Sequence, residues 1–190
     1  ADDFNTSKNL PSALDDFLTK RLNMFLEENS QWLERDARVA AFKNFDLEIV
    51  KNLPCYVGLD LSSTRDLTSI VCLWDADDKF YVKSYFFFVN KGDNALRKGG
   101  VDINKWISDG YVIPCTTPTI DYNLILETLR DIYSKYNVTA LYYDPWHFDR
   151  LLNETKEVGY WCIPIAPGVK NFDPALRFTE ILFYEKKIHI

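Results

Sequence analysis

The sequence predicts an α/β fold built on a mixed β-sheet. Three strand-like runs follow one another between residues 55 and 89, and helical and strand-like patterns alternate after residue 121. Hydrophobic residues make up 47% of the 190 residues, which is enough to form one well-packed domain with an appendage.

The first 50 residues differ from the rest and predict a helical segment. Apolar residues recur there at helical spacing, and Trp32 and Leu33 indicate the start of a second short helix. We interpret residues 1–50 as a linker or docking segment, and residues 51–190 as the main domain. The apolar positions of the first helix are Leu14, Phe17, Leu18, Leu22, Phe25 and Leu26.

The main domain is predicted to begin with three consecutive strands, at 55–61, 68–74 and 80–89, with a turn at 75–79 between the last two. The aromatic run from Tyr85 to Phe88 favours a place in the core over a surface for stacking bases. A long loop over 91–121 is expected next, with a short helix near 103–107, followed by a helix that Asp121 caps and a strand over 138–143. The following helix is expected to end at Gly159, with Phe148, Leu151 and Leu152 on its inner face. A strand over 161–165 and a helix starting at Pro174 complete the domain.

This order of elements is the outline of a ribonuclease H-like domain, with helices flanking a mixed sheet. In such a domain the first and fourth strands lie side by side. Asp60, in the first strand, and Asp144, which ends the fourth, would then face each other although they are far apart in the sequence.

Two facing carboxylates predict a cation site. Asp60 interrupts an apolar strand, where a charge needs a partner or a metal. Paired with Asp144 it would repel unless a cation lies between the two. Mg²⁺ and Mn²⁺ prefer such oxygen ligands and also accept phosphate oxygens, so we expect two ions that clamp a scissile phosphate.

Each acidic residue also has a purely structural interpretation. Asp144 is suited to cap the helix that follows it, and Asp66 is suited to close the hairpin turn. Asp121 is interpreted as a helix cap, and His147 as an exposed helical residue rather than a phosphate ligand.

Composition and charge argue against a generally basic nucleic-acid-binding domain, a zinc protein and a membrane-spanning protein. The net charge of −6 argues against a general electrostatic grip on nucleic acid, although a local basic groove remains compatible with it. The four cysteines contain no CxxC pair, which argues against zinc, and Cys55 and Cys72 are predicted to be core thiols. Neither a signal peptide nor a membrane-spanning run is visible.

Several motifs, in order, resemble the large terminase subunit of tailed bacteriophages, in its HK97-like branch. They are Gly-Leu-Asp-Leu-Ser-Ser-Thr-x-Asp-Leu-Thr at 58–68, Lys-Trp-Ile-Ser-Asp-Gly at 105–110, Thr-Ile-Asp-Tyr at 119–122, Tyr-Asp-Pro-Trp at 143–146 and Lys-Lys-Ile-His at 186–189. No single motif is highly specific, but their order and spacing extend over nearly the whole chain.

The resemblance implies the C-terminal nuclease of a DNA-packaging motor, which cuts concatemeric double-stranded DNA into genome lengths. Asp60 and Asp144 match the family's metal-binding carboxylates, and Asp66 matches a further acidic position near the site. A third metal ligand is expected beyond Ile190, so we expect a nuclease domain that is truncated at its C-terminus. The chain lacks a G-x-x-x-x-G-K-[ST] loop, so the ATPase half is not expected within it.

The implied partners are DNA, the portal protein and the small terminase subunit. The implied location is the host cytoplasm, outside the mature virion and away from membranes. Two other interpretations remain open. One is an actin-like or sugar-kinase-like ATPase domain, which shares the early hairpin but needs downstream glycine-rich loops. The other is a non-catalytic docking module in which the carboxylates act as caps.

Overall fold

The computed structural model describes residues 32–62, 67–89, 102–145, 148, 151, 153–155 and 159–190. The chain divides into two compact units. One comprises residues 45–171, and the other comprises residues 1–44 together with 172–190. The predicted helix at 14–26 lies outside the described residues, and the predicted boundary near residue 50 stays a prediction.

The larger unit is built on the three consecutive strands that the sequence predicts. They are β1 (Pro54–Asp60), β2 (Thr68–Ala76) and β3 (Lys79–Val89), and they pair in antiparallel fashion. Buried and less buried residues alternate along β1 and β2, because successive side chains of a strand point to opposite faces. The tight turn between β2 and β3 uses Asp77 at a positive φ of 63°.

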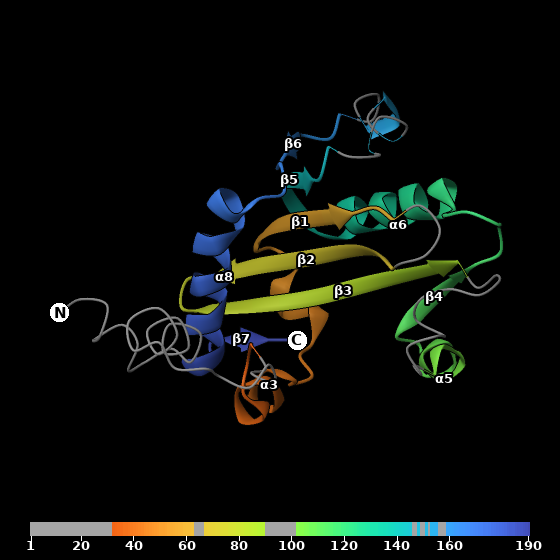
Figure 1. The fold of residues 1–190 in the computed structure, drawn as a ribbon. Helices are drawn as coiled ribbons and strands as arrows, with labels where there is room; N and C mark the ends of the chain where they lie inside the picture. Colours follow the sequence, from red (N-terminus) through yellow and green to blue (C-terminus); the bar gives the residue numbers. More distant parts are fainter. Residues whose placement is uncertain are drawn as a thin grey trace. The chain divides into compact units, whose positions relative to one another are not determined.

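Parallel pairing extends the sheet on the other side of β1. Strand β5 (Asn137–Tyr143) runs parallel to β1, and β6 (Cys162–Pro164) runs parallel to β5. The strand order is β4-β3-β2-β1-β5-β6, so the first and fourth predicted strands do lie side by side (Figure 1). The predicted mixed sheet with flanking helices is confirmed.

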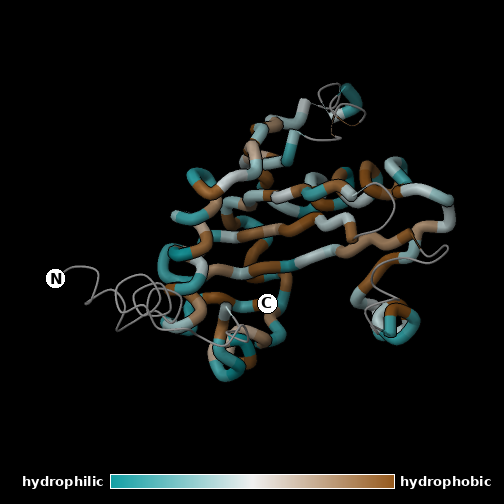
Figure 2. The backbone as a smooth tube through the Cα atoms, in the orientation of Figure 1, coloured by the Kyte–Doolittle hydropathy of each residue, from teal (hydrophilic) through white to brown (hydrophobic). Residues whose placement is uncertain are grey.

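Helix α6 (Tyr122–Lys135) returns the chain from β4 to β5 and lies against the sheet behind β1 (Figure 1). Four of its apolar residues recur at helical spacing and are buried in the main core, together with hydrophobic residues of the strands. The hydrophobic stretches of helix and strands are coloured brown in Figure 2. Residues Leu47–Val50 form a short 3₁₀ helix ahead of β1, and Val50 joins the same core. The buried residues of α6 are Ile125, Leu126, Leu129 and Ile132.

One strand was missed in the sequence. The segment expected to be a loop contains the predicted short helix, α5 (Ile103–Ser108), followed by strand β4 (Val112–Cys115). Strand β4 pairs with β3 at the edge of the sheet. Pro114 made the run look like a loop, yet an edge strand tolerates proline because one side of it needs no ladder hydrogen bonds.

The smaller unit contains α3 (Arg35–Ala41), most of α8 (Val169–Tyr184) and β7 (Ile188–His189). The Trp32 ring packs edge-on against Phe183 at 6.5 Å, and the amide of Ile190 donates to the Ala41 carbonyl at 2.8 Å. Ala37, Ala41, Leu182 and Ile188 are buried.

Two predicted helix starts were wrong. Trp32 and Leu33 precede α3, which begins at Arg35. Helix α8 begins at Val169, and Pro174 lies inside it. Pro174 is the sixth residue of α8, so its missing N–H costs the helix one hydrogen bond, to the carbonyl of residue 170. None of the described helices is long and apolar enough to cross a membrane.

Candidate functional site

The candidate site lies where the neighbouring strands β1 and β5 end. Their parallel register pairs Gly58 with Tyr142 and Leu59 with Tyr143. Asp60 and Asp144 each follow one residue later, so both leave the same edge of the sheet on strands that are spaced by about 4.8 Å. The structure therefore places together the two aspartates that the sequence analysis paired.

Asp60 is exposed, which corrects one step of the sequence argument. Cys55, Val57 and Leu59 form the buried face of β1, and Asp60 is out of phase with them at the end of the strand. Its charge is therefore not buried within an apolar strand. The case for a cation rests on its position beside Asp144, which is half-buried.

A buried hydroxyl closes the hairpin loop that follows Asp60. The Thr68 side chain is 0% exposed, and its Oγ1 accepts a hydrogen bond from the amide of Ser62 at 2.9 Å. The same hydroxyl lies 3.4 Å from Ser62 Oγ. This pair fixes both ends of the loop directly after Asp60. Asp66 and His147 lie outside the described residues, so the role of Asp66 stays a prediction.

Packing on both sides holds the chain around Asp144. The Tyr143 and Phe148 rings stack, with centroids 3.8 Å apart and planes inclined by 25°. Directly after the neighbouring strand β6, the amide of Ile165 donates to the Tyr143 carbonyl at 2.8 Å. Phe148 and Leu151, two of the three residues predicted on the inner face of this segment, are buried in the core.

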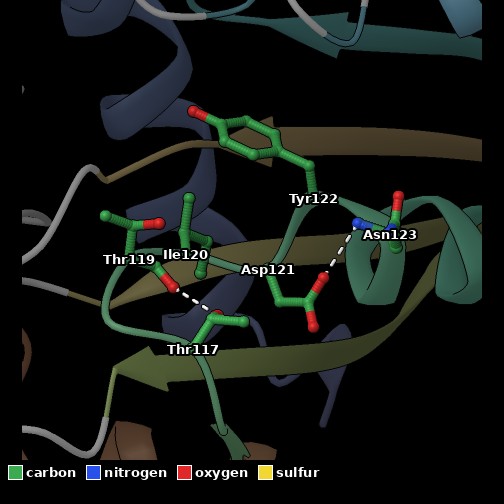
Figure 3. Close-up of a pocket in the computed structure, with 6 residues that line it drawn as sticks. All are labelled: Thr117, Thr119, Ile120, Asp121, Tyr122 and Asn123. Carbon is green, nitrogen blue, oxygen red and sulfur yellow. Dashed lines mark hydrogen bonds between the residues drawn. The ribbon is translucent and has the colours of Figure 1, made fainter.

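A surface hollow of about 180 Å³ lies at the start of α6 (Figure 3). Its Asp121 carboxylate accepts hydrogen bonds from the amides of Asn123 and Leu124, at 3.0 and 3.3 Å, and the Thr117 hydroxyl donates to the Thr119 carbonyl. The predicted capping role of Asp121 is thus confirmed. The Asp121 carboxylate and the Thr117 hydroxyl are thus engaged in local hydrogen bonds, and we do not assign a ligand to the hollow.

The cysteines are core residues, as predicted for two of them. Cys55 and Cys72 are fully buried, and a hydrogen bond with the Cys55 thiol together with burial raises the pKa of Cys72 far above its usual value. A protonated thiol is neither a metal ligand nor a nucleophile. Among the residues that the structure describes, no cluster of three or more histidines, cysteines and acidic residues could hold a metal.

The sequence matches the family described as "Terminase large subunit, endonuclease domain" over residues 2–190. The chain belongs to this family. A curated relative of this terminase domain, the terminase large subunit of Enterobacteria phage HK97, is 23% identical over 137 residues. That match covers 70% of the present chain and 27% of the relative.

The crystal structure of the HK97 bacteriophage large terminase shares the fold of this terminase domain. The two superpose with a TM-score of 0.73 over 100% of the present chain and 40% of the other, at 21% sequence identity. This confirms the ribonuclease H-like architecture. The chain thus spans less than half the length of the relatives that it matches.

Sequence reasoning found both strand-end aspartates of this terminase domain but missed the contacts that hold them. Thr68 appeared in the sequence only as the first residue of a strand, and Phe148 only as part of a helix face. No sequence pattern predicts the Tyr143–Phe148 stack, because Tyr143 ends β5 and Phe148 lies outside that strand.

Proposed function

We propose that this domain is the metal-dependent endonuclease of a phage DNA-packaging motor, and that it cuts concatemeric double-stranded DNA into genome units. The observation that carries the proposal is the register of β1 and β5, which brings Asp60 and Asp144 to the same edge of the sheet. Membership of the terminase endonuclease family supports this assignment and disfavours the phosphate-binding ATPase alternative.

The residues present fit Mg²⁺ or Mn²⁺. Both ions are hard cations that prefer carboxylate oxygens, and Mg²⁺ is commonly held by one or two carboxylates while waters and substrate phosphates complete its shell. Asp60 and Asp144 supply such a pair, and the exposure of Asp60 leaves room for a phosphate to approach. We assign these two residues as the ligands and expect two ions, with Asp66 as a third acidic residue near the site.

The protein's own contribution is to hold two negative charges close together at a fixed edge. Two neighbouring carboxylates repel each other, so Asp60 and Asp144 would favour binding of a cation, which they would hold together. When bound, two such ions would polarise the scissile phosphate and lower the pKa of the attacking water. The parallel pairing with β5 holds the end of β1 beside the end of β5, the Ser62–Thr68 hydrogen bond ties the end of β1 to β2, and the Tyr143–Phe148 stack packs the end of β5.

The net charge of −6 makes a general electrostatic grip on DNA by this domain unfavourable. We therefore propose that the remainder of the motor, including the portal protein and the small terminase subunit, presents the DNA to the domain. The proposed place of action is the host cytoplasm.

The test is to replace each carboxylate with its neutral isostere in the full-length protein. Asp60→Asn and Asp144→Asn are each expected to reduce Mn²⁺-dependent plasmid cutting by at least about 100-fold, because each removes a ligand charge. Chelation of divalent ions is expected to abolish cutting by the wild type. Asp131→Asn is the matched control, because this exposed carboxylate pairs with Lys135 on α6 at 2.7 Å.

A second measurement separates the nuclease from a docking module. Mn²⁺ is expected to raise the thermal unfolding temperature of the wild type and of Asp131→Asn, but not that of Asp60→Asn or Asp144→Asn. If the carboxylates were only caps, Mn²⁺ would not discriminate among these variants. Full cutting by Asp60→Asn would remove this residue from the mechanism.

A further inference from the structure

We propose that Phe148 is a positioning residue for Asp144: its ring, stacked on Tyr143, fixes the direction in which the Asp144 carboxylate leaves the sheet. The inference rests on the proposed function, because it concerns how a proposed metal ligand is held. It adds a residue that contacts neither the proposed metal nor DNA.

The stack brackets Asp144 directly. Tyr143 precedes Asp144, and Phe148 returns to cover Tyr143 with ring centroids 3.8 Å apart. The amide of Phe148 donates to the Pro145 carbonyl at 3.4 Å, which places the Phe148 backbone beside Pro145. Asp144 therefore belongs to a segment, 143–148, whose two end residues are held together by the stacked rings.

Tyr143, the first end of this segment, is held within the sheet. It is paired with Leu59 of β1 on one side and with Pro164 of β6 on the other. The hydrogen bond from the Ile165 amide to its carbonyl, at 2.8 Å, fixes its backbone just before Asp144.

Phe148, the second end, is fixed within the core. Its side chain is 1% exposed, and its carbonyl accepts from the amide of Leu151 at 2.9 Å. Leu151 is itself fully buried, and its carbonyl accepts from the Thr155 hydroxyl at 3.0 Å. The aromatic stack therefore connects the sheet to a buried residue of the core, and Asp144 lies between the two rings in the sequence.

Removing the ring would remove the packing that joins Phe148 to Tyr143, the residue directly before Asp144. Residues that orient metal ligands commonly change metal affinity or activity by about 10- to 100-fold when they are replaced. A displacement of about 1 Å at a catalytic group has effects of similar size. We therefore expect the loss of the stack to affect metal dependence more than it affects folding.

The experiment uses the full-length protein and measures plasmid cutting as a function of Mn²⁺ concentration. Phe148→Leu is expected to raise the Mn²⁺ concentration for half-maximal cutting by about 10- to 100-fold. Tyr143→Leu, which removes the other ring, should have the same effect, and the double variant should be no worse than either single one. Tyr143→Phe keeps the stack and should keep the wild-type Mn²⁺ dependence.

The matched control is Phe45→Leu. The Phe45 ring contacts Tyr81 at 5.0 Å, and Tyr81 pairs with Trp74 beside Cys55 near the start of β1, at the opposite end of that strand from Asp60. The same loss of a ring there should lower the free energy of unfolding without changing the Mn²⁺ concentration for half-maximal cutting, which we call the Mn²⁺ midpoint. Circular dichroism reports whether each variant is folded, and Tyr143→Leu carries the test if Phe148→Leu is not.

The outcomes are distinguishable. A shift in the Mn²⁺ midpoint for both leucine variants, absent in Phe45→Leu and Tyr143→Phe, supports the inference. A midpoint within twofold of the Phe45→Leu control for both variants, or strictly additive effects in the double variant, overturns it. Wild-type cutting by Asp144→Asn would instead overturn the proposed function itself.

Discussion

Thr68 shows how a single buried hydroxyl can support a candidate site without being one of its proposed ligands. Its Oγ1 accepts a hydrogen bond from the amide of Ser62, two residues after Asp60, and its side chain is inaccessible to water. Losing such an acceptor destabilises the fold, because the Ser62 amide loses its partner within the protein and the site of the hydroxyl is not accessible to a replacing water.

Replacing Thr68 with its isostere valine is expected to lower the free energy of unfolding by about 1–3 kcal/mol. The loss should appear as a lower urea midpoint at unchanged slope. Thr128→Val is the matched control: that hydroxyl donates to the Leu124 carbonyl within α6, where the helix already supplies a backbone partner. Equal losses in the two variants would contradict the role given to Thr68.

The sequence predicted the positions of the two aspartates correctly, but not the exposure of Asp60. The positions of Asp60 and Asp144 followed from strand ends, which apolar runs mark well in a sequence, and the register then placed them together. The exposure of Asp60 was not predictable from its apolar neighbours, because it depends on where the strand ends relative to the two-residue period of the pleat.

Helix α6 is the element whose start was clearest in the sequence. Asp121 caps it through two backbone amides, and the helix begins directly after it. Strand β4 and the start of α8 were not predicted, because a proline in each pattern suggested a break. Sheet edges accept proline, and sequence alone did not show that Pro114 lies at one. Pro174 lies in the second turn of α8, where a proline costs one helix hydrogen bond and is therefore not expected.

The cap gives a prediction for α6. Asp121→Ala is expected to lower the free energy of unfolding by about 0.5–2 kcal/mol, while Asp121→Ser, which can still accept from the helix amides, should lose much less. Urea unfolding measures both. Neither variant should change the Mn²⁺ dependence of cutting, and a change in that dependence would show that Asp121 has a role beyond capping.

At the scale of the whole molecule, buried acids with raised pKa values set the response to alkaline pH. Burial raises the pKa values of Tyr85 and Tyr133, and the hydrogen bond with Cys55, together with burial, raises that of Cys72. The folded protein therefore keeps protons that the unfolded chain releases above about pH 8.5 for cysteine and about pH 10 for tyrosine.

Because the folded state binds more protons in this range, stability must fall as the pH rises. The stabilisation is fully present below about pH 8.5, and the urea midpoint is expected to decrease steadily between pH 8.5 and pH 10.5. Cys72→Val, which removes one of these groups, should show a shallower decrease. A urea midpoint independent of pH over this interval would contradict the assignment.

The parallel pairing of β1 with β5 also affects when the candidate site can form during folding. Asp60 and Asp144 are 84 residues apart in the chain, and the strands that carry them must meet across this distance. The β1–β2–β3 meander closes through local contacts, whereas such long-range pairing forms slowly. During synthesis, β1 leaves the ribosome well before β5 exists. We therefore expect a nascent or prematurely terminated chain to lack a complete carboxylate pair, which would spare nearby DNA from cleavage until the domain has folded.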